Sequence, residues 1–316
     1  MSMEQRVITI VGGTGFLGRY VVQRLARAGF RLRIISRNPD RARNLKTAGH
    51  VGQIALIAGD ITNPDTYASS IPGSYAVINL VGIMCEHGKQ DFASVHSVGA
   101  EKLAIAAKAA GVKRFIQISS LGVEHELGSS YARSKFLGER AVVLAFPEAT
   151  ILRPSVMFGP EDNFFNKFAK MASISPALPV IGGGKTLFQP VYVDDVACAI
   201  ETCLAKPETK GHTYELGGPQ VYTMKQLIEY ILLITGRSRK IVNLPFGIAA
   251  CLGGVGEYLP SPPLTRDQVK LLRYNNTVNP DLKSFSQLGI TPTAVELIVP
   301  EYLSIYHKKD YGKLAA

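Results

Sequence analysis

The sequence contains few cysteines and no long apolar segment, and both shortages exclude whole classes of protein. Its four cysteines form no CxxC pair and have no histidine at metal-ligand spacing, so we expect reduced thiols and no metal site. No apolar run approaches the length of about eighteen residues that spans a bilayer, so no transmembrane segment is expected. The apolar run VITIV begins at residue 7, which leaves no room for a signal peptide and predicts a cytoplasmic protein.

Acidic residues are also in short supply. The chain has 25 acidic against 35 basic residues, which gives a formal net charge of +10 and a pI near 9.4. This excess predicts an acidic partner, such as an anionic cofactor, a membrane surface, an acidic protein or a nucleic acid. Because the basic residues are scattered and lack interleaved aromatic residues, we expect no nucleic acid among the partners.

The order of the apolar segments predicts an α/β fold. Continuously apolar runs alternate with longer helical patterns, which is typical of parallel strands covered on both faces by helices. Strands are expected at 7–11, 31–36, 54–60, 76–82, 114–120 and 150–156, and helices at 15–28, 41–46, 99–110 and around 131–135. The sequence therefore predicts a Rossmann-type, doubly wound parallel sheet.

The alternation loosens after residue 156, and a last strand is expected within 212–218. We predict an NAD(P)-binding domain over 1–156 that segments within 187–218 complete. The smaller, mainly helical lobe is expected to consist of 157–186 and 219–316. The apolar stretch 244–263 is interpreted as a core helix, with contact to a quinone-like ligand or to lipid as the alternative.

Three glycines stand where the first strand meets the first helix. Gly12, Gly15 and Gly18 lack a β-carbon, which permits a tight turn and the close approach of a pyrophosphate to backbone N–H groups. A glycine-rich turn alone can be purely structural. Its strand-turn-helix setting favours a dinucleotide site.

The end of the second expected strand indicates which dinucleotide is bound. Arg37 stands where sites that prefer NAD commonly carry an acidic residue, and a guanidinium suits a 2′-phosphate. We therefore expect NADP(H) rather than NAD(H), which remains the alternative together with a simple solvated basic face. Asp60 and Ile61, at the end of the third strand, are expected to border the adenine.

A tyrosine and a lysine lie four residues apart in the segment SSYARSKFLGER. On a helix, this spacing places Tyr131 and Lys135 on one face, where the ammonium favours the phenolate and prepares the tyrosine for proton transfer. Such pairs are also common on exposed helices with no chemical role. The neighbouring Asp194 and Asp195 point in different directions, so we interpret them as helix-capping residues rather than as a catalytic pair.

Several motifs together resemble a known family. GGTGFLG (12–18), GDI (59–61), NLVG (79–82), ISSLG (118–122), YARSK (131–135) and LRPSVMFGPED (152–162) resemble the extended or atypical short-chain dehydrogenase/reductases. RPSVMFGPEDNFFNKFA (153–169), FQPVYVDDVA (188–197) and PLTRDQVKLL (263–272) are more narrowly similar to the family of nucleotide-binding accessory subunits of respiratory complex I (NADH:ubiquinone oxidoreductase) and its bacterial relatives.

The resemblance implies roles for individual residues. Tyr131 would be the general acid/base and would also contact the cofactor, Lys135 would bind the nicotinamide ribose, and Ser120, or else Ser119, would bind the substrate oxygen. His96 departs from the pattern, because extended members often carry there an asparagine that braces the lysine through water; we interpret it as a core or surface histidine. The remaining cofactor contacts would come from Gly12, Thr14, Gly15, Phe16, Leu17, Gly18, Arg37, Asp60, Ile61, Leu80, Val81, Gly82 and Pro154.

Two functions are compatible with these features. One is an NADP(H)-binding accessory subunit of complex I, peripheral at the inner face of the respiratory membrane, whose basic surface faces other subunits or anionic lipid. The other is an NADP-dependent oxidoreductase, epimerase or dehydratase that acts on a small molecule, either a nucleotide sugar or a compound of the quinone pathway.

Overall fold

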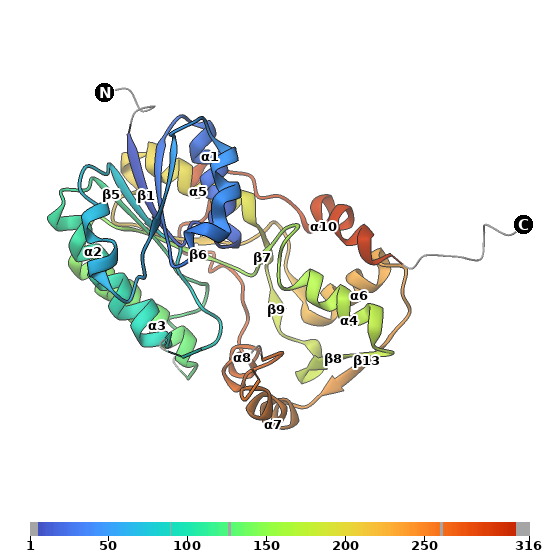
Figure 1. Cartoon of the computed structure of the whole chain (residues 1–316). Helices are drawn as coiled ribbons and strands as arrows, with labels where there is room; N and C mark the ends of the chain where they lie inside the picture. Colours follow the sequence, from blue (N-terminus) through green and yellow to red (C-terminus); the bar gives the residue numbers. More distant parts are fainter. Residues whose placement is uncertain (1–5, 89, 126–127, 260–261, 308–316) are drawn as a thin grey trace, which may run out of the picture. The chain divides into compact units, whose positions relative to one another are not determined.

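The computed structural model describes residues 6–88, 90–125, 128–259 and 262–307 of the chain (Figure 1). The chain divides into two compact units, and each consists of several segments. Unit 1 contains 1–154, 193–217 and 278–291, and unit 2 contains 155–192, 218–277 and 292–316. We assigned 278–291 to the smaller lobe from the sequence, whereas the structure places it in unit 1. There Glu215 donates its backbone N–H to Lys283 and accepts the N–H of Asn279 with its carboxylate.

Unit 1 is built on a parallel sheet of seven strands among the described residues, in the order β11-β6-β5-β4-β1-β2-β3. The prediction of a doubly wound parallel sheet is therefore confirmed. Neighbouring strands pair in parallel throughout, and the chain reverses its direction of winding between β1 and β4. The strands are β1 (Val7–Val11), β2 (Arg31–Ser36), β3 (Ile54–Ala58), β4 (Ala76–Asn79), β5 (Arg114–Ile118), β6 (Thr150–Pro154) and β11 (Thr213–Leu216).

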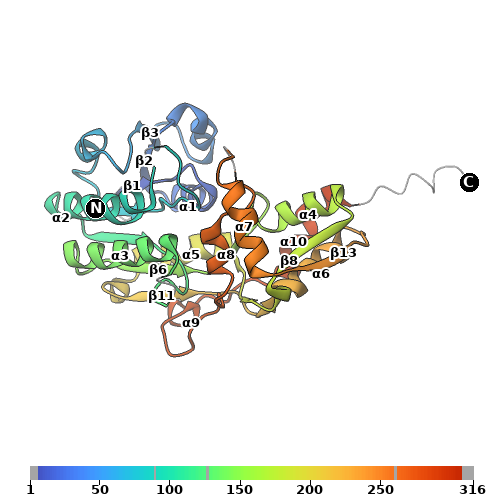
Figure 2. The same ribbon diagram turned by 90° about the horizontal axis from the view of Figure 1, so that it is seen from below.

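Helices cover both faces of this sheet because its strands are apolar on both sides. Every residue of β4, β5 and β6 is buried, which is the pattern expected of parallel strands within two helical layers. One layer contains α1 (Phe16–Arg27) and α5 (Val193–Ala205), and the other contains α2 (Gly99–Ala109) and α3 (Ser130–Ala145), which lie side by side in Figure 2. The short α9 (Phe285–Leu288) packs against β11 and α5.

Two short helical segments of unit 1 differ from ordinary α-helix. The α-helix predicted over 41–46 is a 3₁₀ helix, Pro39–Ala48, and its buried residues Ala42 and Leu45 are three apart, as the three-residue turn of that helix requires. Ala93–Val98 forms a π-helical turn that leads directly into α2. Single π-helical turns occur frequently at functional sites.

Unit 2 has three small two-stranded sheets and its own hydrophobic core, in the described part of the chain. The strand pairs are β7 (Met157–Phe158) with β10 (Val191–Tyr192), β8 (Ala177–Ile181) with β13 (Lys240–Leu244), and β9 (Leu187–Phe188) with β12 (Tyr222–Thr223). Its helices are α4 (Phe165–Ile174), α6 (Met224–Ile234), α7 (Phe246–Gly256), α8 (Arg266–Leu271) and α10 (Val295–Leu303). The core lies among α4, α6 and α10 and includes Phe158, Phe165, Leu178, Ile228, Ile231 and Val299.

The helix predicted within 244–263 exists as α7, but it is not a core helix. Its small residues Ala249, Gly253 and Gly256 are buried, whereas Ile248, Leu252 and Val255 are exposed. Composition alone predicted burial here, because it does not show which face of a helix turns inward. No helix of the described residues is long and apolar enough to cross a membrane.

A single arginine connects four segments of unit 1 in its interior. Arg153 on β6 donates two hydrogen bonds to Glu139 on α3, at 2.8 and 2.9 Å, and lies 2.7 Å from Glu124 and 3.5 Å from Glu215 on β11. The Arg153, Glu139 and Glu215 side chains are each 7% exposed or less. Burial disfavours the charge of Arg153, but these carboxylates more than compensate and raise its pKa.

Replacing Arg153 by methionine is therefore expected to destabilise unit 1. The variant would leave buried glutamates without their cation, which costs about 3–5 kcal/mol when one partner of a buried pair is removed. Chemical denaturation measures this change in the free energy of unfolding. The matched control is Arg43→Met, which breaks the exposed Arg43–Asp40 pair and is expected to leave stability unchanged. Equal stability of the two variants would contradict a structural role for the Arg153 cluster.

Candidate functional site

The glycine turn between β1 and α1 has the geometry that a pyrophosphate requires. Gly12 has a φ of +84°, a conformation that side chains disfavour, and its carbonyl accepts the N–H of Gly15 at 3.1 Å. A β-carbon on Gly18 would lie 2.5 Å from the carbonyl carbon of Gly13, so α1 can pack this closely on the turn only with glycine there. Gly15 has no side chain with which to cap the helix, and the first helical turn holds no acidic residue. The free N–H groups at the start of α1 are thus suited to bind an anion.

The end of β4 lies against this turn. A β-carbon on Gly12 would lie 3.1 Å from the backbone of Leu80 and Val81, so the two loops can approach only because Gly12 lacks a side chain. Asn79 fixes the second loop, because its side-chain oxygen accepts the N–H of Val81 at 3.1 Å and its amide donates to Gln117 at 2.9 Å. The site thus forms at the carboxyl ends of β1 and β4, where winding reverses and ligands bind in open α/β sheets.

Lys135 extends the site from these loops to α3. Its side chain is buried, and Nζ donates to the carbonyl oxygens of Val81 at 3.4 Å and Ile118 at 3.3 Å. A β-carbon on Gly82 would lie 3.1 Å from Nζ, so this loop too approaches without a side chain. Burial lowers the pKa of Lys135 to about 8, against the opposing influence of Glu139. The lysine therefore carries a charge that backbone carbonyls only partly stabilise.

Tyr131 stands one helical turn before Lys135, at the start of α3. Ser129 caps the helix by accepting the N–H of Ala132 at 3.2 Å. The half-buried Tyr131 ring makes edge contacts with Phe92 and His96, at centroid distances of 5.9 and 5.4 Å. The structure therefore brings Tyr131 and Lys135 together on the helix that borders the glycine-lined loops, as the spacing predicts.

His96 lies on the π-helical turn and is a buried core histidine. Its Nε2 accepts the N–H of Ile83 at 3.0 Å, and its Nδ1 lies 2.9 Å from the hydroxyl of Ser134, which donates to the carbonyl of Tyr131. Because the serine hydrogen is used in this way, Nδ1 carries the histidine proton. Burial, aided by the nearby Lys135 charge, lowers the pKa of His96 to about 2. The imidazole is therefore a neutral link between α3 and the loop after β4.

A glycine allows α3 to pack this closely on the π-helical turn. A β-carbon on Gly138 would lie only 2.0 Å from the carbonyl oxygen of His96. The sequence motifs did not identify Gly138, Ser134 or Asn79 as site residues. The spacing of Ser134 and Gly138 on the Tyr131 helix was the signal available, but only the structure shows what they contact.

The two candidate serines follow β5 and differ in their surroundings. Ser119 is 4% exposed, and its hydroxyl has no hydrogen-bond partner among the described residues. Its N–H donates to Leu152, and the N–H of Leu121 donates to Pro154 at the end of β6. Ser120 is less buried than Ser119. Since neighbouring side chains of an extended segment point in opposite directions, only one of the two hydroxyls can face a ligand.

The end of β3 holds the two residues expected near the adenine. Asp60 accepts hydrogen bonds from the N–H and hydroxyl of Thr62 at 2.9 Å and from Gln90 at 3.1 Å. Burial opposes its ionisation, but these bonds, with the charge of Arg37, lower the pKa of Asp60. The Ile61 side chain is buried in the core of unit 1, so only its backbone is available to border an adenine.

Arg37 is exposed directly after β2. Thr14 of the glycine turn and Ser36 lie 3.2 Å apart through their hydroxyls, which ties the turn to the end of β2 where Arg37 follows. Within the described part of the chain, Arg37 makes no hydrogen bond or ion pair. Arg43, by contrast, is paired with Asp40.

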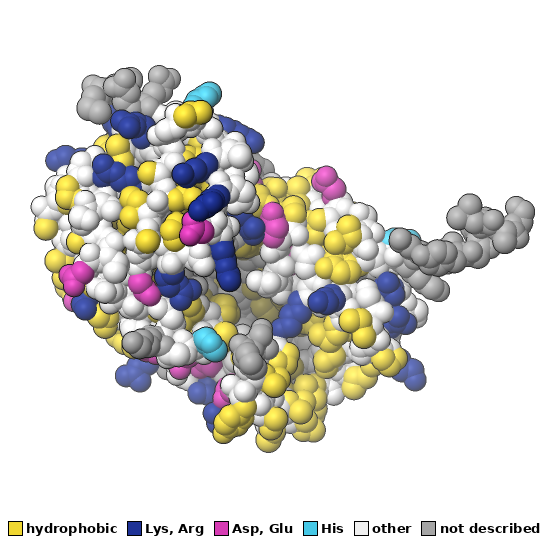
Figure 3. Space-filling view, viewed as in Figure 1, with side chains coloured by type: hydrophobic (Ala, Val, Ile, Leu, Met, Phe, Trp, Pro, Cys, Tyr) yellow, Lys and Arg dark blue, Asp and Glu magenta, His cyan; other side chains and the backbone are white. Residues whose placement is uncertain are grey.

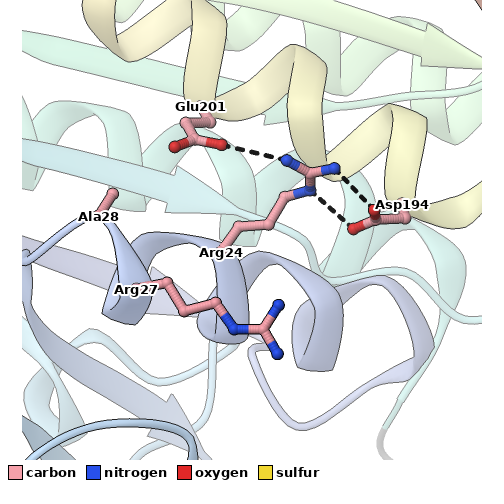
Figure 4. A pocket seen from close by; sticks show the side chains of 5 residues that line it. All are labelled: Arg24, Arg27, Ala28, Asp194 and Glu201. Carbon is pink, nitrogen blue, oxygen red and sulfur yellow. Dashed lines mark hydrogen bonds and ion pairs between the residues drawn. The ribbon is translucent and has the colours of Figure 1, made fainter.

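A separate depression of about 330 Å³ lies between α1 and α5 and does not belong to this site (Figure 4). Arg24 binds Asp194 through two hydrogen bonds of 2.6 and 2.7 Å and also contacts Glu201. These bonds raise the pKa of Arg24. Arg24 lies about 14 Å along the helix from Gly15, given the rise per residue of α-helix. Asp194, in the first turn of α5, thus forms an ion pair with Arg24 of α1 and is not one of a catalytic pair.

Comparisons with known proteins agree with this geometry. A model described as the NAD dependent epimerase/dehydratase family matches residues 8–217. The "NADH dehydrogenase [ubiquinone] 1 alpha subcomplex subunit 9, mitochondrial" of Arabidopsis thaliana is 37% identical over 97% of this chain and 79% of its own length. The "Ceramide reductase" of Caulobacter vibrioides is 31% identical over 78% of this chain and 76% of its own length.

Solved structures agree on the fold. The crystal structure of DesIV, a dTDP-glucose 4,6-dehydratase from Streptomyces venezuelae with NAD and TYD bound, superposes with a TM-score of 0.74 at 18% identity. The match covers 95% of this chain and 96% of that chain. At this identity the likeness concerns the fold.

The buried His96 predicts a specific pH dependence of stability. The unfolded chain protonates His96 below its ordinary pKa of 6.5, whereas the folded chain stays neutral down to about 2. Below pH 6.5 the unfolded state thus binds more protons, so His96 lowers stability by about 1.4 kcal/mol for each pH unit of acidification. In His96→Asn this contribution disappears. We expect denaturation between about pH 6 and pH 4 to give a shallower slope for the variant than for the parent.

The control for this measurement is His50→Asn, which removes an exposed imidazole and is expected to keep the slope of the parent. The comparison uses slopes because the smaller asparagine also changes absolute stability. Identical slopes for His96→Asn and the parent would show that His96 is not held neutral in the folded state.

Proposed function

Because this chain belongs to the NAD-dependent epimerase/dehydratase family of the short-chain dehydrogenase/reductases, we propose that it is an NADP(H)-binding accessory subunit of respiratory complex I. The bound cofactor is mainly structural or regulatory in this proposal. Similarity to the Arabidopsis subunit over nearly the whole chain, including unit 2, is the observation that carries it. The protein would act on the inner, cytoplasmic side of the respiratory membrane, bound to other subunits.

The residues present fit a dinucleotide. The cradle at Gly12, Gly15 and Gly18 offers uncapped N–H groups and no negative charge, which suits a pyrophosphate. Thr14, Phe16 and Leu17 complete this turn, while Leu80, Val81 and Gly82 would line the adenosine side. Asp60, the backbone of Ile61 and Pro154 are the further proposed contacts. Lys135, a buried cation beside Gly82, would bind the ribose of the nicotinamide half.

Arg37 supports NADP(H) over NAD(H). It is exposed, uses none of its donors within the described residues, and follows a strand end that Thr14 ties to the glycine turn. A guanidinium in this place can bind a 2′-phosphate through paired, charge-assisted hydrogen bonds.

The subunit proposal is tested with the native protein. Purification from membranes in gentle detergent is expected to retain complex I subunits, and denaturation of the purified material is expected to release NADPH. A protein that is recovered free of complex I, in the cytosol alone, would exclude the subunit role. If such free protein still released NADPH, the proposal of cofactor binding would stand, and the enzyme would become the favoured function.

Replacement of Arg37 tests the cofactor preference. Arg37→Ala is expected to weaken NADPH binding about 10- to 100-fold, because charge-assisted hydrogen bonds are lost, and to leave NADH binding unchanged. Titration of both nucleotides by fluorescence measures the dissociation constants. Arg31→Ala, with the same loss of charge at the opposite end of β2, is the matched control. A variant that discriminates as well as the parent would show that Arg37 does not bind the phosphate.

An active enzyme is the second candidate, and the buried Lys135 beside Tyr131 favours it together with the reductase among the relatives. When bound, the nicotinamide ring would supply or accept hydride. The ammonium of Lys135 would favour the Tyr131 phenolate, Tyr131 would transfer the proton, and Ser120 would orient the substrate oxygen. A nucleotide sugar or a quinone-pathway compound is the proposed substrate class.

Tyr131→Phe separates the two functions. If the protein is an enzyme, turnover of carbonyl or quinone substrates is expected to fall at least about 100-fold, because the proton donor is lost. NADPH affinity should fall far less than turnover, because phenylalanine keeps the aromatic ring, and a nucleotide titration measures this affinity in parallel. The control is Tyr258→Phe, which removes the hydroxyl of a fully solvated tyrosine. Equal rates for Tyr131→Phe and the parent would remove Tyr131 from the mechanism.

A further inference from the structure

Helix α7 of unit 2 packs with its small residues inward. Its buried face consists of Ala249, Gly253 and Gly256. A β-carbon on Gly253 would lie 2.9 Å from the backbone of Thr265 and Arg266, and one on Gly256 would lie 3.0 Å from the carbonyl of Leu264. The segment that leads into α8 therefore contacts the backbone of α7 directly. The large side chains of α7 have no room on this face.

The outer face of α7 is an exposed aliphatic stripe. Ile248, Leu252 and Val255 follow the helical spacing of four and three residues, and Leu259 follows in the turn after the helix; the four are 54%, 56%, 72% and 54% exposed. Figure 3 shows hydrophobic side chains gathered over α7 at the lower edge of the molecule. Surface helices of soluble domains normally show the reverse arrangement, with large apolar residues inward. We call these four residues the α7 stripe.

The composition of α7 also indicates that its exposed face binds a partner. No charged side chain occurs between Phe246 and Gly256, and glycine occupies four of these eleven positions. Glycine lowers helix propensity, so α7 derives little stability from its own backbone preference. An uncharged, glycine-rich helix that exposes a continuous apolar stripe marks an interaction surface.

The surroundings of the stripe favour a negatively charged, flat partner. From the start of α7 at residue 246 to residue 277, the chain carries three basic and two acidic side chains, a net charge of +1, and Arg266 pairs with Glu257 at 2.8 Å. Lys270 lies on α8, which packs against α7, and the Arg273 guanidinium lies 4.6 Å from the ring centroid of Phe246 at the start of α7. Tyr258 is exposed beside the end of the stripe, and tyrosine is enriched where apolar lipid meets water.

The dimensions also suit a membrane surface. Eleven helical residues extend about 16 Å, which is half the thickness of a bilayer core. The helix can therefore lie in the plane of the interface but cannot span it. Protein interfaces are typically rich in aromatic residues and methionine at their centre, whereas the α7 stripe is aliphatic.

We propose that α7 docks unit 2 onto an anionic lipid surface. The α7 stripe enters the boundary between headgroups and acyl chains, and Lys270 and Arg273 contact the negatively charged headgroups. This docking depends neither on the cofactor nor on complex I subunits. It therefore goes beyond the proposed function and can fail or hold independently of it.

The absence of tryptophan from the sequence provides a clean experiment with the full chain. Leu252→Trp places a single fluorescent reporter in the stripe, and Leu297→Trp places one at an exposed leucine of α10 as the matched control. Vesicles of phosphatidylcholine and phosphatidylglycerol are expected to shift the Leu252→Trp emission to shorter wavelength and to leave the control unchanged. Binding to vesicles of phosphatidylcholine alone should be weaker by a factor of about ten or more.

A second pair of variants tests the stripe by sedimentation with the same vesicles. Val255→Glu is expected to abolish co-sedimentation, whereas Leu297→Glu should sediment like the parent, and circular dichroism confirms that both fold. Nucleotide titration of Val255→Glu should match the parent, which separates this result from any failure of the cofactor site. The proposal is overturned if vesicles shift neither reporter or both alike. It is also overturned if Leu252→Trp shifts without lipid as protein concentration rises, since a second copy would then cover the stripe.

Discussion

The candidate site depends on one buried guanidinium. Arg153 holds Glu139 of α3, Glu215 of β11 and Glu124 of the loop after β5, and so fixes these segments relative to β6. Glu139 stands one turn beyond Lys135 on the same face of α3. The ion pair therefore determines where the helix with Tyr131 and Lys135 sits above the sheet. Without it, the remaining contacts of α3 would have to bear the repulsion of several buried carboxylates.

Three glycine contacts then bring the loops of the site together. Gly12 admits the loop after β4, Gly82 admits the Lys135 ammonium, and Gly138 admits the carbonyl of His96. In each case the neighbour occupies the space that a side chain would need. The result is a compact arrangement in which a cation and an imidazole are buried within one cluster. Burial favours the neutral form of both groups, and each forms a hydrogen bond with a backbone group.

This arrangement is compatible with both candidate functions because they share the same physical requirements. A tightly held dinucleotide needs uncapped N–H groups and fixed loops, and so does a reacting one. The features that distinguish them lie elsewhere. The neutral His96 is bonded at both ring nitrogens, so it serves as a link and not as a proton carrier. The similarity to the Arabidopsis subunit covers nearly the whole chain and so includes unit 2.

The sequence allowed the sheet and the glycine turn to be predicted because both depend on local patterns. Apolar runs with turn residues between them place β1 to β6 correctly, although four strands end earlier than predicted, at Ala58, Asn79, Ile118 and Pro154. The residues beyond these ends leave the ladder and form the site. The Arg153 cluster, the π-helical turn and the outward face of α7 could not be predicted in this way. Each depends on contacts between residues far apart in the chain, which a single sequence does not record.

The route of the chain through unit 1 has a consequence for its synthesis on the ribosome. Six strands are complete when Pro154 has been made, but β6 is then the edge of the sheet, and its partner β11 begins only at Thr213. During this interval β6 exposes an apolar edge with unpaired N–H and C=O groups, which can pair with another chain. Arg153 also lacks one of its carboxylate partners, because Glu215 has not yet been synthesised. Translation speed between these two points thus affects how much of the nascent protein reaches the native topology.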